Sequence, residues 1–531
     1  MRQARSRAGI ALIGTAALVA LAACGGGSSA GNGGTSGGGS DKTIIWGSTD
    51  KPVTFDPAGA YDLPSWNVIY NVYQTLLRVD PTTEKNVPDA AESCDPSADF
   101  KTWTCKLKPG LKFSNGDPLT ATDVKFSFDR VLKINDPSGP ASLLAKVKTD
   151  AVDDTTVVFH LASPNTLWNF IISTGAGAIV DSKVFPAAKK LADDKIIGSG
   201  PYALTSYKTN DVAQFKPNPN YTGDVKLSNG GLAIQYYQDE SALKLDVQQG
   251  KVDVAYPGLS PTALNELKCK SGVNVIKGAG GAIRYTVFNL KTMPGDNAAQ
   301  KLAIRRAFAF ILDRKSLAEN VYQGTVDPLY SMIAPGLAGQ KNVYKDEFGE
   351  GGDKGKAKSE LDKAGVKTPV SLQIWYVGDD HYGSLSADEY TEIKRQLEGS
   401  GLFKVDLKNT AWDQYTTLCL TDKCPIYQLG WFPDYPDSDD YVAQFYGSTS
   451  FLNNHYSNAK VDALLKDEQG TTDQAKRTQD FQQIQEESVA DAPVVPTWVG
   501  AQFAVTHGNV TGVQSTLTPD YIFRFWLLGK S

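Results

Sequence analysis

The sequence predicts an α/β protein with at least two sheets, because strand-like and helix-like segments alternate over about 490 of its 531 residues. Thr43–Ser48 (TIIWGS) is rich in β-forming residues. Ser65–Asp80 instead places its apolar residues three to four positions apart, as a helix does. Turn-forming clusters such as SNGDP separate the segments. This length is enough for two or three domains, and no internal repeat is visible.

The first expected elements are a strand over Thr43–Ser48 and a helix that Ser65 caps. A second helix runs over Thr120–Leu132, with Thr120 or Thr122 as its N-cap. A long amphipathic helix over Ala299–Gly324 is expected to break after Asp313–Arg314. Further strands are expected within 104–108, 152–161, 233–238, 284–290, 370–378, 404–410, 425–432 and 494–506, with a hairpin around 209–211. Further helices are expected within 239–250, 387–401, 461–469 and 473–493.

The N-terminus has the pattern of an export signal. Three arginines precede an apolar run from about Ala8 to Ala23, which is too short and too plainly bounded for a transmembrane helix. Leu21–Cys24 resembles a bacterial lipobox, in which the cysteine becomes the lipid-modified first residue. We therefore expect a lipoprotein signal over residues 1–23 and lipid attachment at Cys24. The alternative is an ordinary cleaved signal with an accidental cysteine.

Residues 24–40 form a Gly/Ser-rich segment that we interpret as a tether. Such a chain buries little apolar surface, and it would span roughly 20–25 Å on average. Its G-x-S-x-G match, Gly34–Gly38, is discarded because a nucleophile elbow needs a preceding strand and a following helix.

Charge argues against nucleic acid as a partner. The net charge of −6 becomes about −9 once the three arginines of the signal are removed, whereas nucleic-acid binding requires a basic face. We also expect no metal and no cofactor. The four histidines are scattered, neither close cysteine pair has C-x-x-C spacing, and the acids do not follow EF-hand spacing.

Six cysteines are present, and one of them belongs to the proposed anchor. Cys94 and Cys105 flank two short predicted strands, and Cys419 and Cys424 flank a tight loop. In an exported chain each close pair predicts a disulfide. Cys269 is then left as a free thiol, expected to be partly buried.

Four of these segments resemble the family 5 solute-binding proteins of ABC importers, which serve peptides, nickel and some oligosaccharides. The most specific is Lys106–Val131 (KLKPGLKFSNGDPLTATDVKFSFDRV). Gly198–Leu204, Ile304–Gly324 and Gly430–Tyr441 follow in the order and spacing of that family. The resemblance extends from about Ile44 to the C-terminus.

The resemblance implies a two-lobed fold of the periplasmic-binding-protein type, class II, with an extra β-rich subdomain and a ligand cleft between the lobes. Lobe I would comprise residues 41–84, 195–285 and 496–531. The inserted subdomain would comprise residues 85–194, and lobe II residues 286–495. Closure of the lobes would bury the ligand.

The resemblance also implies a ligand site at Gly430–Asp440 (GWFPDYPDSDD). In peptide-binding members the aspartate three residues after the Gly-Trp pair, here Asp434, binds the α-ammonium group. A buried ammonium needs such a carboxylate. Trp431 would offer its ring face, worth about 0.5–2 kcal/mol as a cation–π contact, and Phe432 would lie beside it. Gly430 would leave its backbone free to pair with an extended ligand.

On the first lobe, Tyr61 and the backbone near Leu63 occupy positions that contact ligand in oligopeptide receptors. A simpler reading of DYPDSDD is a solvated turn, and we expect Asp437, Asp439 and Asp440 to be solvated or to cap a helix. Tyr376, Trp412 and Tyr415 fit the cleft or the core equally well.

One segment departs from the family pattern. Dipeptide receptors hold the ligand carboxylate with an arginine where this chain has Gly378-Asp379-Asp380-His381-Tyr382. Two acids would repel a carboxylate. A longer peptide, a cationic peptide or another solute therefore fits better than a free dipeptide, and nickel fits poorly. His381 is expected at the surface.

These observations predict a receptor rather than an enzyme: a lipid-anchored, monomeric substrate-binding protein at the outer face of the cell membrane. Its partners would be a peptide or other small solute and the ABC permease. A secreted hydrolase using paired carboxylates is one alternative, although neither H-E-x-x-H nor a credible nucleophile elbow is present. A sensor of the same fold that does not transport is another.

Overall fold

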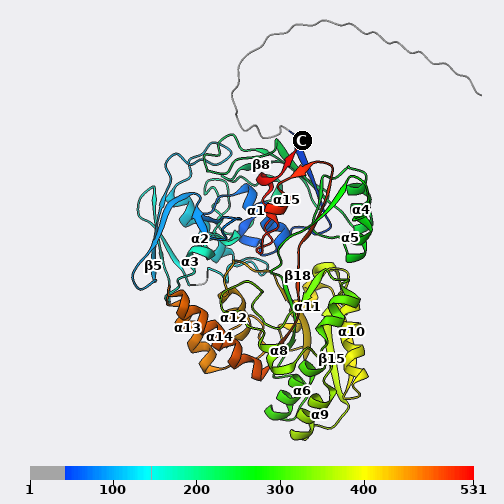
Figure 1. Cartoon of the computed structure of the whole chain (residues 1–531). Helices are drawn as coiled ribbons and strands as arrows, with labels where there is room; N and C mark the ends of the chain where they lie inside the picture. Colours follow the sequence, from blue (N-terminus) through cyan, green and yellow to red (C-terminus); the bar gives the residue numbers. More distant parts are fainter. Residues whose placement is uncertain (1–41, 145) are drawn as a thin grey trace, which may run out of the picture. The chain divides into compact units, whose positions relative to one another are not determined.

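The computed structural model describes residues 42–144 and 146–531 (Figure 1). Its first strand belongs to a seven-stranded mixed sheet. Its order is β12-β19-β11-β1-β10-β9-β8, and β1 is parallel to β10 and β11. The strands are β1 Thr43–Ser48, β8 Tyr202–Lys208, β9 Val212–Pro217, β10 Gly231–Tyr236, β11 Val254–Ala255, β12 Val273–Lys277 and β19 Phe503–His507. The associated helices are α1 Leu63–Val72, α4 Glu240–Gln248, α5 Pro261–Leu267 and α15 Val513–Thr516.

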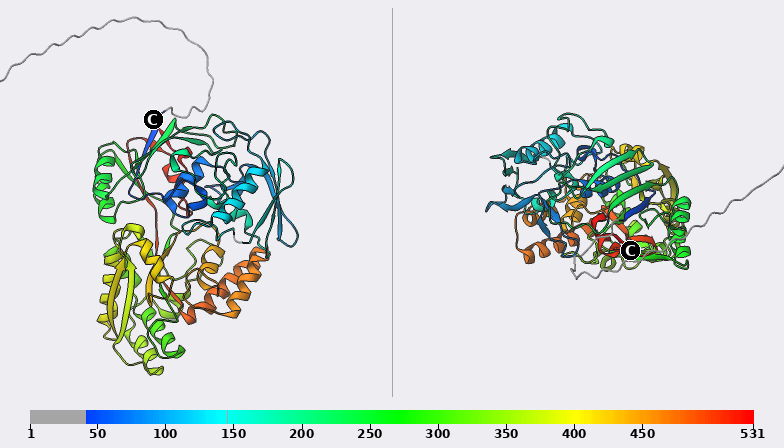
Figure 2. Two further views of the ribbon diagram at one scale, coloured as in Figure 1. Left: turned by 180° about the vertical axis from the view of Figure 1, so that it is seen from behind. Right: turned by 90° about the horizontal axis from the view of Figure 1, so that it is seen from above.

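A six-stranded sheet organises the second half of the chain, in the order β14-β18-β13-β17-β15-β16. Its strands are β13 Ile283–Phe288, β14 Val326–Pro328, β15 Val370–Val377, β16 Phe403–Thr410, β17 Ile426–Trp431 and β18 Val494–Gly500. Its helices are α6 Ala298–Ile311, α7 Arg314–Ser316, α8 Val343–Phe348, α9 Lys354–Lys363, α10 Ser386–Gly399, α11 Trp412–Cys419, α12 Asp439–Tyr446, α13 Ala459–Gln469 and α14 Gln474–Asp491. Helices α13 and α14 lie side by side in both side views (Figures 1 and 2).

A four-stranded antiparallel sheet, ordered β4-β5-β7-β6, lies within the predicted inserted subdomain. Its elements are β4 Ala91–Pro96, β5 Thr102–Leu107, β6 Lys148–Ala151, β7 Thr156–His160, α2 Ala121–Ile134 and α3 Trp168–Ile171. Two small ribbons pair β2 Leu77–Val79 with β3 Asn86–Pro88 and β20 Val510–Thr511 with β21 Gly529–Lys530. Short 3-10 turns cover Pro57–Gly59, Gly175–Gly177, Asp193–Lys195, Asp380–Tyr382 and Phe525–Leu527, and one π-helical turn covers Leu317–Val321.

Helix α1 begins earlier than predicted. Its N-cap is Asp62, whose side chain accepts a hydrogen bond from the backbone of Ser65 at 3.0 Å, so the prediction that Ser65 caps this helix is wrong. Pro64 is tolerated in the first turn because its missing N–H has no intrahelical partner there. The Thr120 cap of α2 is confirmed, with a capping box to Asp123.

Two segments carry the described chain between the two larger sheets: residues 278–282 after β12 and residues 501–502 after β18. They are joined by backbone hydrogen bonds from Gly278 to Gln502 and from Gly500 to Ala282, each 2.9 Å long. A Cβ atom at Gly280 would overlap the carbonyl oxygen of Gly500. The close approach of the two crossing segments therefore requires glycine at this position.

The predicted division into lobes remains a proposal; the membership of the sheets supports two lobes but not two of the predicted boundaries between them. The predicted boundaries at 285/286 and 495/496 fall inside β13 and β18, and both strands pair entirely within the six-stranded sheet. The predicted signal, Cys24 and the tether lie outside the described residues. Within those residues, no helix is both long enough and apolar enough to cross a membrane.

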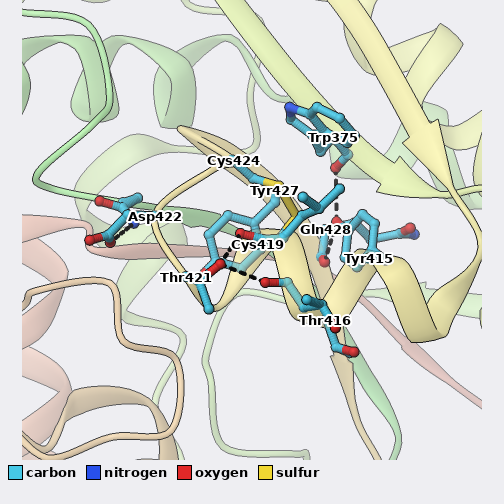
Figure 3. Close-up of a disulfide and its surroundings, with 12 residues drawn as sticks. Trp375, Tyr415, Thr416, Cys419, Thr421, Asp422, Cys424, Tyr427 and Gln428 are labelled. Atoms are coloured by element: carbon cyan, nitrogen blue, oxygen red, sulfur yellow. Dashed lines mark hydrogen bonds between the residues drawn. A yellow bond between two sulfur atoms is a disulfide. The ribbon is translucent and has the colours of Figure 1, made fainter.

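Both predicted cysteine pairs lie at bonding distance. Cys94 and Cys105 face each other across β4 and β5, with Cα atoms 4.0 Å apart. Cys419 and Cys424 join the end of α11 to the start of β17, with Cα atoms 4.6 Å apart (Figure 3). Cys269 is a free thiol, but it is exposed. The expected partial burial is therefore wrong, because Cys269 follows α5 in a surface turn.

Candidate functional site

The acidic–aromatic segment, residues 430–440, joins β17 to α12. Gly430 and Trp431 are the last residues of β17, and the chain then turns through residues 432–438. Helix α12 begins at Asp439, so the segment presents its side chains at the end of the six-stranded sheet.

Asp434 is buried, with 8% of its surface exposed. Its carboxylate accepts a hydrogen bond of 2.6 Å from the hydroxyl of Tyr61, which lies in the loop before α1. Tyr61 and Asp434 are 373 residues apart in sequence. The structure thus brings together two of the predicted site residues, one from each predicted lobe.

Asp440 lies directly behind Asp434 and is fully buried. Its Oδ2 atom accepts hydrogen bonds from the indole N–H of Trp431 at 3.0 Å and from the backbone N–H of Asp434 at 2.9 Å. Its Oδ1 atom has no hydrogen-bond partner in the part of the chain that the structure describes. Within the described residues, both buried carboxyl groups therefore have only neutral hydrogen-bond donors.

Burial dominates the electrostatics of this pair. It raises the pKa of Asp434 to about 7, and the hydrogen bond from Tyr61 opposes the rise. The pKa of Asp440 is raised well above its usual range by burial and then by the neighbouring charge of Asp434. Neither carboxyl group forms a salt bridge with any described residue. Burying two carboxyl groups without a cation is costly unless they are protonated or a bound ligand supplies a positive charge.

The other two aspartates of the segment have a different environment. Both oxygens of Asp437 accept hydrogen bonds from the Arg477 guanidinium, at 2.9 and 2.7 Å. Asp437 also accepts a hydrogen bond of 2.9 Å from the backbone of Asp439, the first residue of α12, whose N-cap is Ser438. Asp439 is buried and accepts hydrogen bonds from the Tyr435 hydroxyl and the Gln469 amide, both at 2.9 Å. The expectation that Asp439 and Asp440 are solvated or act as caps is therefore wrong.

The predicted aromatic residues lie beside Asp434 but have packing partners of their own. The ring of Trp431 packs against Phe445 and Phe451, with centroids 5.7 and 5.5 Å away. The ring of Phe432 meets Tyr521 edge-on at 5.3 Å. Trp431 and Phe432 are both half-buried, so part of each ring remains open to a ligand.

Leu63 and Gly430 have structural roles as well. Leu63 begins α1 and packs its half-buried side chain against the core of the seven-stranded sheet. Gly430 lies opposite Arg284 across β17 and β13. The role of all these residues in ligand binding remains a proposal.

The sequence does not decide whether Tyr376, Trp412 and Tyr415 line the cleft or belong to the core. Tyr415 belongs to the core: it is fully buried, and its hydroxyl donates to the carbonyl oxygens of Trp375 and Gln428 at 3.1 and 2.8 Å (Figure 3). Tyr376 stacks on Tyr390 at 5.9 Å. Trp412 stacks on His381, which is exposed, with ring centroids 3.8 Å apart.

A buried arginine was not among the predicted site residues. Arg284 lies on β13, whose six residues are all buried, and its guanidinium contacts Phe432 of the acidic–aromatic segment. The sequence did contain a signal, because an arginine within the apolar strand RYTVFNL needs a partner or a function. Among the described residues, no group of three or more His, Cys, Asp or Glu side chains could hold a metal ion.

Comparison with known proteins agrees with this architecture. A probable D,D-dipeptide-binding periplasmic protein of Escherichia coli is 29% identical over 472 residues, which cover 85% of this chain and 87% of the relative. The substrate-binding protein CtaP of an ABC transporter from Listeria monocytogenes superposes with a TM-score of 0.77 at 25% identity, covering 93% of this chain and 99% of its own. The Helicobacter pylori protein DppA, crystallised with the peptide STSA, gives a TM-score of 0.79 at 19% identity and covers 92% of this chain and 98% of its own.

The fold is therefore that of the two-lobed, α/β periplasmic binding proteins, and the predicted fold class is confirmed. The family model described as "Bacterial extracellular solute-binding proteins, family 5 Middle" matches residues 85–453, well over half of the chain. The chain belongs to the bacterial extracellular solute-binding proteins of family 5.

Proposed function

We propose that this protein is the lipid-anchored substrate-binding receptor of an ABC importer. It captures a peptide or similar small solute between its lobes and delivers it to the permease. The names of its relatives support this proposal, since they include a dipeptide-binding protein and a receptor crystallised with a peptide. The N-terminal signal and the cysteine of its lipobox support export and anchoring at the outer face of the cell membrane.

The observation that carries the proposal is the buried carboxylate of Asp434, which has no cation among the described residues and contacts Tyr61 of the other predicted lobe. A peptide ammonium in this position would replace the Tyr61 hydroxyl as the donor. It would also supply the positive charge that Asp434 and Asp440 lack. Because Tyr61 of one predicted lobe reaches the carboxylate of Asp434 on the other, an occupant of this carboxylate would link ligand capture to lobe closure.

A peptide series tests this assignment on the full chain. Peptides with free N-termini should raise the melting temperature, because a ligand that binds the folded state stabilises it by mass action. N-acetylated forms of the same peptides should bind at least about 10-fold more weakly, since they lack the ammonium. Asp434→Ala should abolish binding and leave the fold intact.

The matched control is Asp388→Asn, which changes an exposed acid on α10 of the same predicted lobe. It should bind like the wild type. Calorimetry that finds unchanged affinity in Asp434→Ala would rule out this residue as the ammonium receptor. Stabilisation by sugars or metals and by none of the peptides would instead assign the protein to another solute.

Anchoring and delivery need separate experiments. Metabolic labelling with palmitate should mark the wild-type protein and not Cys24→Ser, which should be released into the medium. Uptake of a bound peptide should stop when the gene is deleted. Normal uptake in that strain, together with tight binding by the purified protein, would favour the sensor of the same fold.

A further inference from the structure

Arg284 is a buried cation at the edge of the candidate site. It lies on β13 directly opposite Gly430 of β17, and only 4% of its surface is exposed. A Cβ atom at position 430 would overlap its Nη1 atom. Glycine at position 430 therefore makes room for this guanidinium, a role additional to the free backbone that we predicted.

The Arg284 guanidinium has aromatic neighbours but, among the described residues, no carboxylate within 4.0 Å. Its central carbon lies 4.2 Å from the ring centroid of Tyr382, 5.0 Å from Trp498 and 5.1 Å from Phe432. Its Nη1 atom donates a hydrogen bond of 3.0 Å to the backbone oxygen of Ile283, and Nε has no partner among the described residues. Rings stabilise a cation only in part, so donor capacity and charge remain for an anion.

Comparison with the other buried arginines shows what is distinctive here. Arg130, Arg477 and Arg524 form salt bridges with aspartates. Arg305 and Arg314 have no carboxylate partner within 4.0 Å in the described chain, but each donates its Nε–H to a backbone carbonyl. Lack of a counter-ion is therefore not sufficient evidence for a site. Arg284 differs because it contacts the acidic–aromatic segment itself, through Phe432 and Gly430.

The charges of this region are complementary to a zwitterion. In the described chain, Asp434 and Asp440 are buried acids with no cation within 4.0 Å, and Arg284 is a buried cation with no carboxylate within that distance. The buried acid that Arg284 does influence is Glu389, whose pKa is raised by burial and lowered, to a smaller extent, by the charge of Arg284. The two aspartates and Arg284 do not neutralise one another, because no salt bridge joins them. A ligand with an ammonium and a carboxylate would supply both missing charges at once.

We infer that Arg284 binds a carboxylate of the same ligand whose ammonium group binds at Asp434. The inference rests on the proposed function, and it narrows the solute to a peptide with a free N-terminus and a carboxylate within reach. The segment at residues 378–382 has no arginine for this purpose, but its Tyr382 lies against Arg284. The positive group is thus supplied by another strand. The carboxylate comes either from the C-terminus of a short peptide or from an acidic side chain.

Peptide pools distinguish these sources. The full chain is incubated with pools of di- to pentapeptides that have free N-termini and either free or amidated C-termini, and retained peptides are identified by mass spectrometry. The tightest binder is then compared with its matched neutral form by calorimetry. We expect the carboxylate form to bind about 10- to 100-fold more tightly than its amide. A preference for the C-terminal acid assigns the peptide terminus, and a preference for Asp or Glu over Asn or Gln assigns the side chain.

Arg284→Gln should reduce the ratio of carboxylate-form to amide-form affinity to about 1. Arg284→Lys keeps the charge but loses the planar, bidentate guanidinium, and it should retain part of this preference. Arg314→Gln is the matched control: it removes a buried arginine stacked on Tyr330, and it should leave the preference unchanged. If Arg284→Gln weakens binding of the acid and amide forms equally, the inference is overturned and this arginine is structural. If both affinities stay as in the wild type, the inference is also overturned, while the peptide-receptor proposal remains intact. Retention of no peptide from any pool would overturn both.

Discussion

The four aspartates of the segment 430–440 differ in their partners, because among the described residues only Asp437 forms a salt bridge. Asp437 is held by both nitrogens of the Arg477 fork, which also donates to Glu468 at 2.9 Å. Asp434 and Asp440 are at least as buried, but tyrosine, tryptophan and backbone groups are their only donors in the described chain. An acid in a buried ion pair depends on its cation, since removing one partner is strongly destabilising, whereas a buried acid without a cation can receive the charge of a ligand. The partner, and not the residue type, separates the two roles.

The largest effect on stability is expected when Arg477, the cation that pairs with Asp437 and Glu468, is removed. Arg477→Met leaves Asp437 with a desolvated charge and no counter-ion, so we expect the free energy of unfolding to fall by about 3–5 kcal/mol. Urea denaturation measures the loss. Lys460→Met, which breaks the exposed pair with Glu487 on α13 and α14, should cost less than about 1 kcal/mol. Similar losses in the two variants would contradict the structural role of Arg477.

The next effect concerns pH at the unpaired acids. The pKa of Asp434 is raised to about 7, so its carboxyl group holds a proton below that pH. An ammonium ligand requires the ionised form. Affinity should therefore increase about 10-fold per pH unit from pH 5 to pH 7 and then level off, with proton release on binding below pH 7. Calorimetry in buffers of different ionisation enthalpy measures both quantities.

The stability of the unliganded protein should change with pH in the opposite direction to its affinity for the ligand. A carboxyl group whose pKa is higher in the folded state binds protons more tightly there than in the unfolded chain. The unliganded protein should consequently lose stability as the pH rises from about 4 to about 7. In Asp434→Asn this part of the pH dependence should weaken for both binding and stability. A pH profile identical to that of the wild type would show that another group titrates.

A smaller effect is expected at Tyr61. Tyr61→Phe removes the hydroxyl that donates to Asp434 and leaves the ring, which packs on Trp66 at 5.4 Å. The loss should destabilise the ionised unliganded protein by about 1–3 kcal/mol and move the pH midpoint of binding upward. Tyr376→Phe is the control, because its hydroxyl accepts from Asn409 at a half-buried position away from the acids. An unchanged midpoint in Tyr61→Phe would separate Tyr61 from the titrating group.

The smallest effect is expected at Trp431. Trp431→Phe keeps a ring against Phe445 and Phe451 and deletes the hydrogen bond to Asp440. We expect a loss of about 1 kcal/mol in stability and a shift of binding toward higher pH that is smaller than the shift in Tyr61→Phe. A larger shift than in Tyr61→Phe would show that Asp440, and not Asp434, is the main receptor.

The elements of this protein could be predicted well because their signals are local. The β-forming composition of Thr43–Ser48 and the N-cap that begins the helix of residues 120–132 each depend on neighbours within a few residues, and the structure confirms both elements. The close spacing of Cys94 and Cys105 likewise determined their pairing across β4 and β5. The wrong N-cap at Ser65 is a local failure, since Asp62 and Ser65 both suit a cap and only the backbone path selects between them.

The sequence by itself determined the α/β class, the family and the position of an acidic segment after a buried strand. Only the tertiary structure decided which acids of that segment have a cation, because Arg477 lies 40 residues from Asp437 and Tyr61 lies 373 residues from Asp434. It also decided that a buried arginine, Arg284 on a neighbouring strand, lies against this segment and against Tyr382 of residues 378–382. Secondary structure follows from periodicity along the chain, whereas the charge balance of a buried site depends on contacts between distant segments, which periodicity does not encode.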